Sequence, residues 1–397
     1  MKCSLQTRIP NFNCKCQGPN KPEWNPAEIR EEYGLKLTEA EKEIILAKMP
    51  PPDKEGKIYA DAIFEGGGVR GIAFLGALRC CNDIGLHWRK LAGTSAGAIT
   101  AAFLAAGFNS DRLEDILGKL DFMEFLSQKT SPLILNGDPA NDLQFPIAMM
   151  LTLALSGQMG EYSSEPFRNW LAYNLDADKL ITFKDIKEKG NGRELKVVVS
   201  DITRGQMLVL PDDLNVTDNP TEKTILQKLG IDNKYDFSIP EAVRLSMSIP
   251  MFFAPGKLGD YLIVDGGLLS NFPLWIYDLP ATTQNQQPSW FTFGFRLDDQ
   301  GIQKRFQVKG PFTMLAATFR TMMSARDRYH QREMDRGRVI HIDVTQAHVT
   351  TTDFNLCLEQ KKILYRLGYQ QTKNFFLHTC HSWQEHLAHR GFSPTCI

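Results

Sequence analysis

Short apolar runs that lead into glycine-bearing loops alternate along this chain with longer segments of helical periodicity. The apolar runs predict strands at 59–65, 88–92, 195–201, 261–264, 290–297 and 339–344. Helices are predicted at 72–81, 98–106, 110–128, 166–175, 239–245, 314–332 and 355–377, the last interrupted at Gly368. Strand–turn–helix units of this kind are typical of an open α/β sheet.

The first 57 residues read as an N-terminal extension. Prolines break up its first part, at Pro10, Pro19, Pro22 and Pro26. A charged helix is predicted at 38–49, with Thr38 and Glu41 as a capping box, and three consecutive prolines end it.

Composition and charge narrow the class of protein. The 397 residues are 43% hydrophobic and 23% charged, which is the balance of an ordinary globular chain. A net charge of −1 provides no overall field to recruit nucleic acid, so we expect no nucleic-acid partner. The longest apolar run, at 146–155, is too short to span a bilayer. Any membrane contact is therefore expected to be peripheral and to come from a local patch.

The cysteines indicate a reducing compartment. There are eight, too sparse for a disulfide scaffold, and no secretory signal precedes them, so we expect a cytoplasmic protein. The cysteines and histidines of the last residues are too loosely spaced to favour a zinc site, and Cys14 and Cys16, with one residue between them, are interpreted as plain surface cysteines. We therefore expect no metal and no cofactor.

The segment from Gly93 to Gly97 has the spacing of a nucleophile elbow, Gly-x-Ser-x-Gly. A serine that attacks a carbonyl must stand on a sharp strand-to-helix turn, where side chains two positions before and after it would collide. Gly93 and Gly97 remove that collision. The motif lies between a predicted strand and an alanine-rich helix, so Ser95 is the candidate nucleophile.

A glycine loop, 66–71, follows the first predicted strand and opens a helix. Such a loop directs unpaired N–H groups toward one point. It is open to three interpretations: a tight turn, a phosphate site, or an oxyanion hole to which Arg70 adds positive charge. The phosphate-binding spacing with its lysine is absent, and the loop lies one β-turn-α unit before the elbow, which favours the oxyanion hole.

Asp265 ends the short strand at 261–264 and is followed by Gly266 and Gly267. An aspartate at the carboxyl end of a buried strand is well placed for catalysis in an open α/β sheet. The alternative is a turn former, since Asp-Gly pairs are common in turns.

Together, and in this order, the three glycine-bearing sites closely resemble the patatin-like phospholipase family. Agreement extends to Ser248-Ile249-Pro250 before the aspartate strand and to Asp353-Phe354-Asn355 before the last helix. The resemblance covers about residues 58–377, a catalytic domain. It leaves 1–57 as the N-terminal extension and 378–397 as a C-terminal tail.

The resemblance implies a three-layer α/β/α fold with a central, mostly parallel sheet. It also implies a serine lipid acyl hydrolase of phospholipase A or lysophospholipase type, acting on phospholipid or lysophospholipid. By that match Ser95 is the nucleophile, Asp265 its base and Gly266 and Gly267 a supporting loop. The N–H groups of four loop residues would hold the oxyanion: Gly66, Gly67, Gly68 and Arg70.

Two alternatives to hydrolysis stay open on the sequence. An acyltransferase would pass the acyl group to an alcohol instead of water, and a silent module would only bind lipid. An activating partner is compatible with the sequence but not identified by it. A direct Ser–Asp dyad is expected, because no histidine after Asp265 lies in a glycine-bearing loop directly after a strand, and His348 is the nearest candidate.

Overall fold

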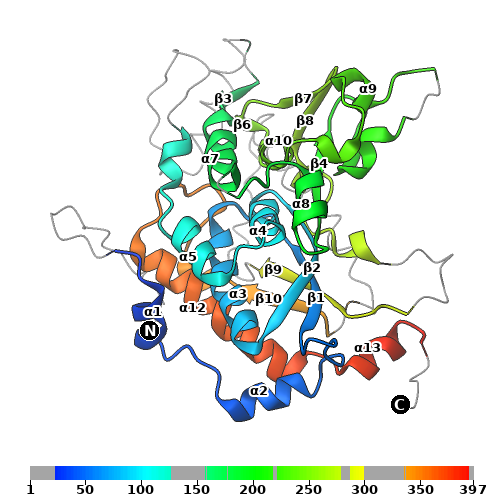
Figure 1. Ribbon diagram of the computed structural model, residues 1–397. Helices are drawn as coiled ribbons and strands as arrows, with labels where there is room; N and C mark the ends of the chain where they lie inside the picture. The colour runs from blue at the N-terminus through cyan, green and yellow to red at the C-terminus, as the bar shows by residue number, and fades with distance from the viewer. Residues whose placement is uncertain are drawn as a thin grey trace, which may run out of the picture.

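An eight-stranded sheet runs through the middle of the computed structural model of this chain (Figure 1). The structure describes residues 23–126, 157, 159–176, 178–217, 221–278, 287–298, 335 and 337–392. The strand order is β10-β9-β1-β2-β4-β8-β7, and β5 also pairs with β4. The strands are β1 (Ile58–Phe64), β2 (Leu86–Thr94), β4 (Glu194–Asp201), β5 (Gln206–Leu210), β7 (Gly256–Leu258), β8 (Tyr261–Asp265), β9 (Phe291–Asp298) and β10 (Val339–Asp343).

The sheet is mostly parallel, as predicted, and all six strands predicted from apolar runs are present. Pairing is parallel from β10 through β9, β1 and β2 to β4, and antiparallel where β5, β8 and β7 join. A separate two-stranded sheet joins β3 (Gly160–Tyr162) to β6 (Met251–Phe253), two short strands that the sequence patterns did not predict.

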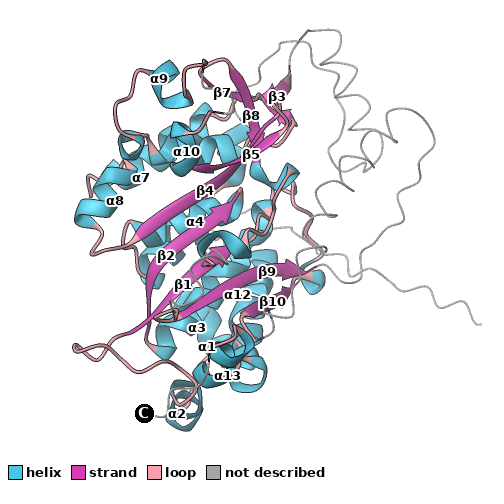
Figure 2. Cartoon of the chain, turned by 90° about the vertical axis from the view of Figure 1, so that its right-hand side faces the viewer, coloured by secondary structure: helices cyan, strands magenta, loops and turns pink. Residues whose placement is uncertain are grey.

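Helices lie on both sides of the sheet, as Figure 2 shows. On β1, Ala60, Ala62 and Phe64 face the larger core, whereas Ile63 faces a smaller one. The larger core is formed with α3 (Ala73–Ile84), α4 (Ala96–Ala105), α10 (Ile239–Ser246) and α12 (Leu358–Asn374). The smaller core is covered by the 3-10 helix Leu274–Tyr277. The period-two alternation of a strand thus supplies one residue set to each layer.

The remaining helices surround this framework. They are α1 (Pro26–Glu32), α2 (Glu39–Leu46), α5 (Ser110–Gly118), α7 (Glu165–Asp176), α8 (Phe183–Lys189), α9 (Ile225–Leu229) and α13 (Trp383–His389). The helical pattern predicted over 110–128 divides into α5 and a 3-10 turn, Phe122–Leu126. The helix predicted at 314–332 and the apolar segment at 145–155 lie outside the described residues.

The predicted interruption at Gly368 is wrong, because α12 continues through it. A Cβ at Gly368 would overlap the Ala73 carbonyl of α3, and a Cβ at Gly76 would overlap the Tyr365 carbonyl of α12. The two glycines therefore let α3 and α12 pack with their backbones in contact. Close helix packing, and not a helix break, explains the glycine.

The described part of the N-terminal extension packs on the core. The capping box is confirmed, since the Glu41 N–H donates to the Thr38 hydroxyl oxygen (3.2 Å) and the Thr38 N–H donates to the Glu41 carboxylate (2.9 Å). Pro26 does not interrupt regular structure, because it occupies the first turn of α1, where a proline's missing N–H is not needed. At the end of α2, the Lys48 ammonium donates to the carbonyls of Phe376 and Leu377.

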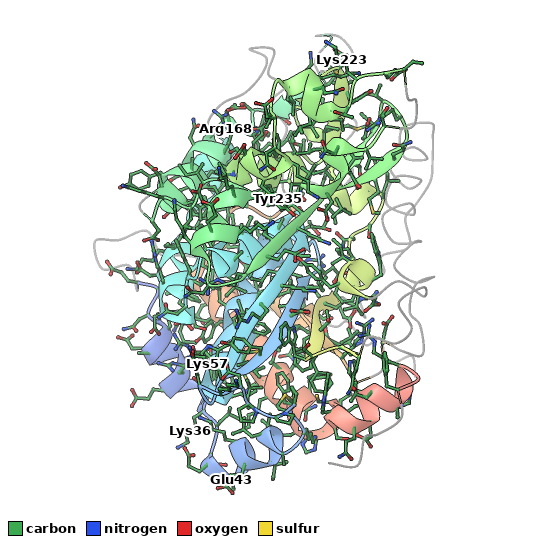
Figure 3. All side chains as sticks on the ribbon, turned by 45° about the vertical axis from the view of Figure 1, so that its right-hand side comes forward. Lys36, Glu43, Lys57, Arg168, Lys223 and Tyr235 are labelled. Atoms are coloured by element: carbon green, nitrogen blue, oxygen red, sulfur yellow. The ribbon has the colours of Figure 1, made fainter. Side chains whose placement is uncertain are left out.

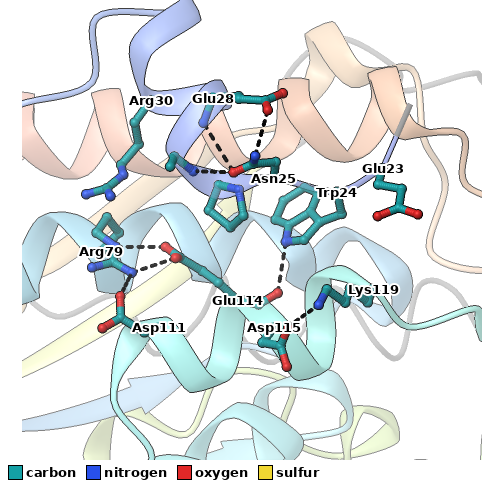
Figure 4. A pocket seen from close by; sticks show the side chains of 12 residues that line it. Glu23, Trp24, Asn25, Glu28, Arg30, Arg79, Asp111, Glu114, Asp115 and Lys119 are labelled. Carbon is teal, nitrogen blue, oxygen red and sulfur yellow. Dashed lines mark hydrogen bonds and ion pairs between the residues drawn. The ribbon is translucent and has the colours of Figure 1, made fainter. Parts of the chain in front are cut away.

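Trp24 anchors the start of the described chain on α5. It is buried and its indole N–H donates to the Glu114 carbonyl (2.8 Å). Figure 4 shows the hollow of about 530 Å³ beside it, where Arg79 forms ion pairs with Glu114 and Asp111. Among the charged groups that line it, Lys119 also pairs with Asp115, and no residue of the three glycine-bearing sites lines the hollow.

The surface carries charges of both signs. Lys36, Glu43 and Lys223 are exposed and extend outward from the ribbon (Figure 3). Among the residues described, no helix combines the length and the apolar character needed to cross a bilayer.

Candidate active site

Ser95 lies at a sharp turn between β2 and α4, where the sequence predicts a nucleophile elbow. Ser95 has φ 53° and ψ −126°, a backbone conformation that non-glycine residues seldom adopt. A Cβ at Gly93 would overlap the Gly97 backbone, and a Cβ at Gly97 would overlap the Phe64 carbonyl. Both glycines are therefore required by close backbone contact: Gly93 by the turn itself, as predicted, and Gly97 by the carbonyl of β1. The Ser95 side chain is buried within the described structure.

Asp265 reaches Ser95 from the opposite direction along the sheet. β4 pairs with β2 up to Val198, opposite Thr94, and the same edge then pairs with β8 from Val199, opposite Asp265. The carboxyl ends of β2 and β8 consequently meet head-on. In an all-parallel sheet these ends would lie side by side, so this approach differs from the one expected for an open parallel sheet.

The Ser95 side chain lies beside the Asp265 carboxylate, which accepts a hydrogen bond from the Gly267 N–H (2.7 Å). Burial raises the pKa of Asp265 to about 6, while the Ser95 hydroxyl and the Gly267 N–H oppose the rise. A Cβ at Gly266 would overlap the Val198 carbonyl, so glycine is required there too. The structure thus brings Ser95, Asp265 and the loop after Asp265 together.

The described histidines lie elsewhere. No described histidine is a hydrogen-bond partner of Ser95 or Asp265. His341 bonds to Asp298 (2.6 Å), and His348 is exposed in the loop after β10, with φ 50°. His330 lies outside the described residues.

The glycine loop lies against the elbow. A Cβ at Gly66 would stand 3.2 Å from the Ser95 Cβ. The Gly66 N–H donates to the Asn271 carbonyl (3.0 Å), and the Arg70 N–H and Nε both donate to the Gly67 carbonyl (3.3 Å each). Within the described part of the chain, the N–H groups of Gly67 and Gly68 have no acceptor. Of the four N–H groups predicted to hold the oxyanion, those of Gly67 and Gly68 are therefore the two that no described acceptor already uses.

Two polar residues missed by the sequence reasoning hold this loop. The Asn271 amide donates to the Gly66 carbonyl (3.0 Å) and to the buried Glu65 carboxylate (3.3 Å). Glu65 also accepts from the Leu297 N–H at the end of β9 (2.6 Å). Their positions beside the glycine loop and after Gly267 were the only sequence signal for them.

Ser246, at the end of α10, was also missed. Its hydroxyl accepts from the Ser95 N–H (2.9 Å) and donates to the Val198 carbonyl (2.6 Å). No sequence spacing connects it with the elbow, because the two serines are 151 residues apart.

A metal centre is not part of the described structure. The described residues hold no group of three or more His, Cys, Asp or Glu side chains arranged around one point. Of the Cys/His tail, Cys396 lies outside those residues.

Known proteins resemble this chain over most of its length. A family model described as patatin-like phospholipase matches residues 62–277. The uncharacterised protein YqhO of Bacillus subtilis (strain 168) is 33% identical over 323 residues, which are 80% of this chain and 98% of that protein.

More distant matches are partial. An uncharacterised NTE family protein of Mycobacterium tuberculosis (strain ATCC 25618 / H37Rv) is 26% identical over 53% of this chain, which spans only 27% of that relative's length. The crystal structure of VipD from Legionella pneumophila aligns with a TM-score of 0.45 at 16% identity, over 83% of this chain and 70% of that one. The family model, which covers more than half of the chain, places it in the patatin-like phospholipase family, a family of lipid hydrolases.

Proposed function

We propose that the protein is a serine lipid acyl hydrolase of phospholipase A or lysophospholipase type, with Ser95 as nucleophile and Asp265 as its base. The observation that supports this most is the placement of Ser95, at a strained strand-to-helix turn and beside a glycine loop, next to the buried Asp265 carboxylate, whose pKa the Ser95 hydroxyl lowers. Substrate would be a phospholipid or lysophospholipid, reached by peripheral contact with a membrane.

The first half-reaction forms an acyl-enzyme. Asp265 accepts the hydroxyl proton as the Ser95 oxygen bonds to the ester carbonyl carbon. The negative charge that develops on the carbonyl oxygen is held by the N–H groups of Gly67 and Gly68. When the ester bond breaks, the leaving alkoxide takes the proton from Asp265 and departs as an alcohol.

The second half-reaction restores the enzyme. Water attacks the acyl-enzyme while Asp265 accepts its proton, and the proton returns to the Ser95 oxygen as the fatty acid leaves. A pKa of about 6 suits both directions, because the carboxyl is ionised at neutral pH yet more basic than an ordinary aspartate.

The division of the chain is also a proposal: residues 58–377 as the catalytic domain, 1–57 as an extension and 378–397 as a tail. The extension is one candidate for restraining the enzyme, and no activating partner is identified. Deleting residues 1–22, which precede Trp24, tests whether activity on vesicles depends on the start of the extension.

Ser95→Ala tests the proposed chemistry. We expect the variant to lose ester hydrolysis and labelling by a fluorophosphonate while keeping its fold. Ser110→Ala is a matched control, because Ser110 is equally buried but donates to the Leu78 carbonyl on α3. Lipid analysis of vesicles incubated with both proteins, with and without lysolipid as acceptor, separates hydrolysis from acyl transfer. Persistent labelling of Ser95→Ala would place the nucleophile elsewhere.

A further inference from the structure

Ser246 forms a buried bridge between the elbow and the sheet. It is the last residue of α10 and its side chain is fully buried. A hydroxyl has one proton and two lone pairs. Because the proton is donated to the Val198 carbonyl (2.6 Å), a lone pair is directed at the Ser95 N–H (2.9 Å). Removing the hydroxyl would deprive both buried backbone groups of this partner.

The group that this bridge holds is the backbone of the proposed nucleophile. A serine at φ 53° keeps that conformation only when its surroundings hold it there. α4, which starts at the next residue, supplies Ser95 with no acceptor for its N–H, since the first N–H groups of a helix lack partners. Ser246 is the acceptor that the described structure provides.

The same turn of chain also contacts the proposed base. The Ser248 carbonyl, two residues after Ser246, accepts from the Asp265 N–H (2.9 Å). Val198, the other partner of Ser246, adjoins Val199, which pairs with Asp265 in the sheet. Residues 246–248 therefore contact the backbones of both Ser95 and Asp265.

We propose that Ser246 is a positioning residue, whose hydroxyl holds the Ser95 backbone so that the nucleophile stays aimed at both Asp265 and the ester carbon. The inference rests on the proposed function of Ser95 and Asp265. Ser246 touches no reacting atom and acts through Ser95. Loss of its hydroxyl should therefore slow the chemical step more than it weakens substrate binding.

Ser246→Ala and Ser246→Cys test the proposal, the second because sulfur fills the site but is a weak hydrogen-bond acceptor. Ser248→Ala is the matched control, because it keeps the Ser248 backbone carbonyl that accepts from Asp265 and removes only a side-chain hydroxyl. Ser248 is buried to the same extent in the same turn, and its hydroxyl donates to the Arg244 carbonyl (3.0 Å) without contacting Ser95.

We expect kcat and the rate of fluorophosphonate labelling to fall about ten- to a hundredfold in both Ser246 variants, with KM little changed, as for a nucleophile displaced by about 1 Å. Rates are measured per folded molecule, well below the unfolding temperature. Ser248→Ala should stay within about twofold of wild type, because the structural loss is similar but the nucleophile is untouched.

The pH profile separates positioning from general destabilisation. The Ser95 hydroxyl lowers the pKa of Asp265, so a displaced hydroxyl should let that pKa rise. The acid limb of kcat/KM should then move to higher pH in the Ser246 variants but not in Ser248→Ala.

Several outcomes would overturn the proposal. The first is a folded Ser246 variant with wild-type kcat and an unshifted acid limb of kcat/KM. The second is a loss of kcat in Ser248→Ala as large as that in the Ser246 variants. The third is a failure of both Ser246 variants to fold. Each of these leaves the proposed function standing. If wild type shows no hydrolysis, or Ser95→Ala still reacts with the fluorophosphonate, the proposed function fails instead.

Discussion

Replacing Asp265 with asparagine should make the protein inactive and, at neutral pH, more stable. Asp265 is 2% exposed, and burial raises its pKa from 3.8 to about 6. An asparagine keeps the shape of the side chain. Its carbonyl oxygen can still accept from the Gly267 N–H, and its amide can donate to the Ser95 hydroxyl oxygen. The substitution thus removes the charge and the base while leaving the neighbouring groups paired.

The size of the effect follows from proton binding. Between about pH 4 and pH 6 the folded protein keeps a proton on Asp265 that the unfolded chain has released. The free energy of unfolding therefore falls as pH rises through this window and stays lower above it. About two pH units, at about 1.4 kcal/mol each, amount to about 3 kcal/mol. Asp265→Asn should be more stable than wild type by up to that amount at pH 7 and equal to it near pH 4.

Urea unfolding of both proteins across this pH range measures the difference, and ester hydrolysis is followed in parallel. Asp61→Asn is a matched control. Asp61 is also buried, and burial raises its pKa to about 6, but it lies within β1 and accepts from the Trp290 indole and the Lys90 N–H. This variant should show a similar dependence of stability on pH and retain hydrolysis.

A stability difference between Asp265→Asn and wild type that does not change with pH would refute the reasoning. So would a variant that is less stable than wild type at pH 7. Hydrolysis retained by Asp265→Asn would show that another group accepts the serine proton.

Three further predictions concern the site. Gly68→Ala should lower kcat about a hundredfold or more with a smaller change in KM, because Gly68 has φ 56° and a Cβ there would overlap the Thr351 carbonyl and displace an oxyanion donor; steady-state kinetics that change only in KM would contradict this. His348→Ala should retain most hydrolysis, and a loss as complete as that of Ser95→Ala would indicate a conventional triad. Hydrolysis should survive dialysis against strong chelators, and activity lost on chelation and restored by added metal would identify a metal site.

The sequence predicted those parts of the site that depend on local backbone geometry. Glycine at position 93 follows from the crowding within a tight turn, and that crowding is present, whereas Gly97 is required by the β1 carbonyl, a contact the local pattern does not show. Strand positions followed from apolar runs of a few residues, which local patterns describe well. The three glycine-bearing sites in this order also indicated the family, because their combination is more specific than any one motif.

What the sequence could not supply is long-range pairing. Whether β8 runs parallel or antiparallel to β4 depends on contacts far away in the sequence, and nothing within residues 261–265 specifies it. The role of Ser246 depends on a contact across 151 residues, and its hydroxyl resembles that of any other helical serine. Gly368 was misjudged for the same reason, since only the neighbouring helix shows why glycine is needed there.

The position of β1 in the sheet has a consequence for the order in which this protein can fold. β1 begins at Ile58 but is flanked by β9, which ends at Asp298, and the outer partner of β9 ends only at Asp343. During synthesis one edge of β1 therefore stays unpaired while more than 200 further residues emerge. Such long loops close slowly, and an unpaired apolar strand edge invites association with other chains. Chains cut short before β9 should aggregate, even though they already contain Ser95, Asp265 and the glycine loop.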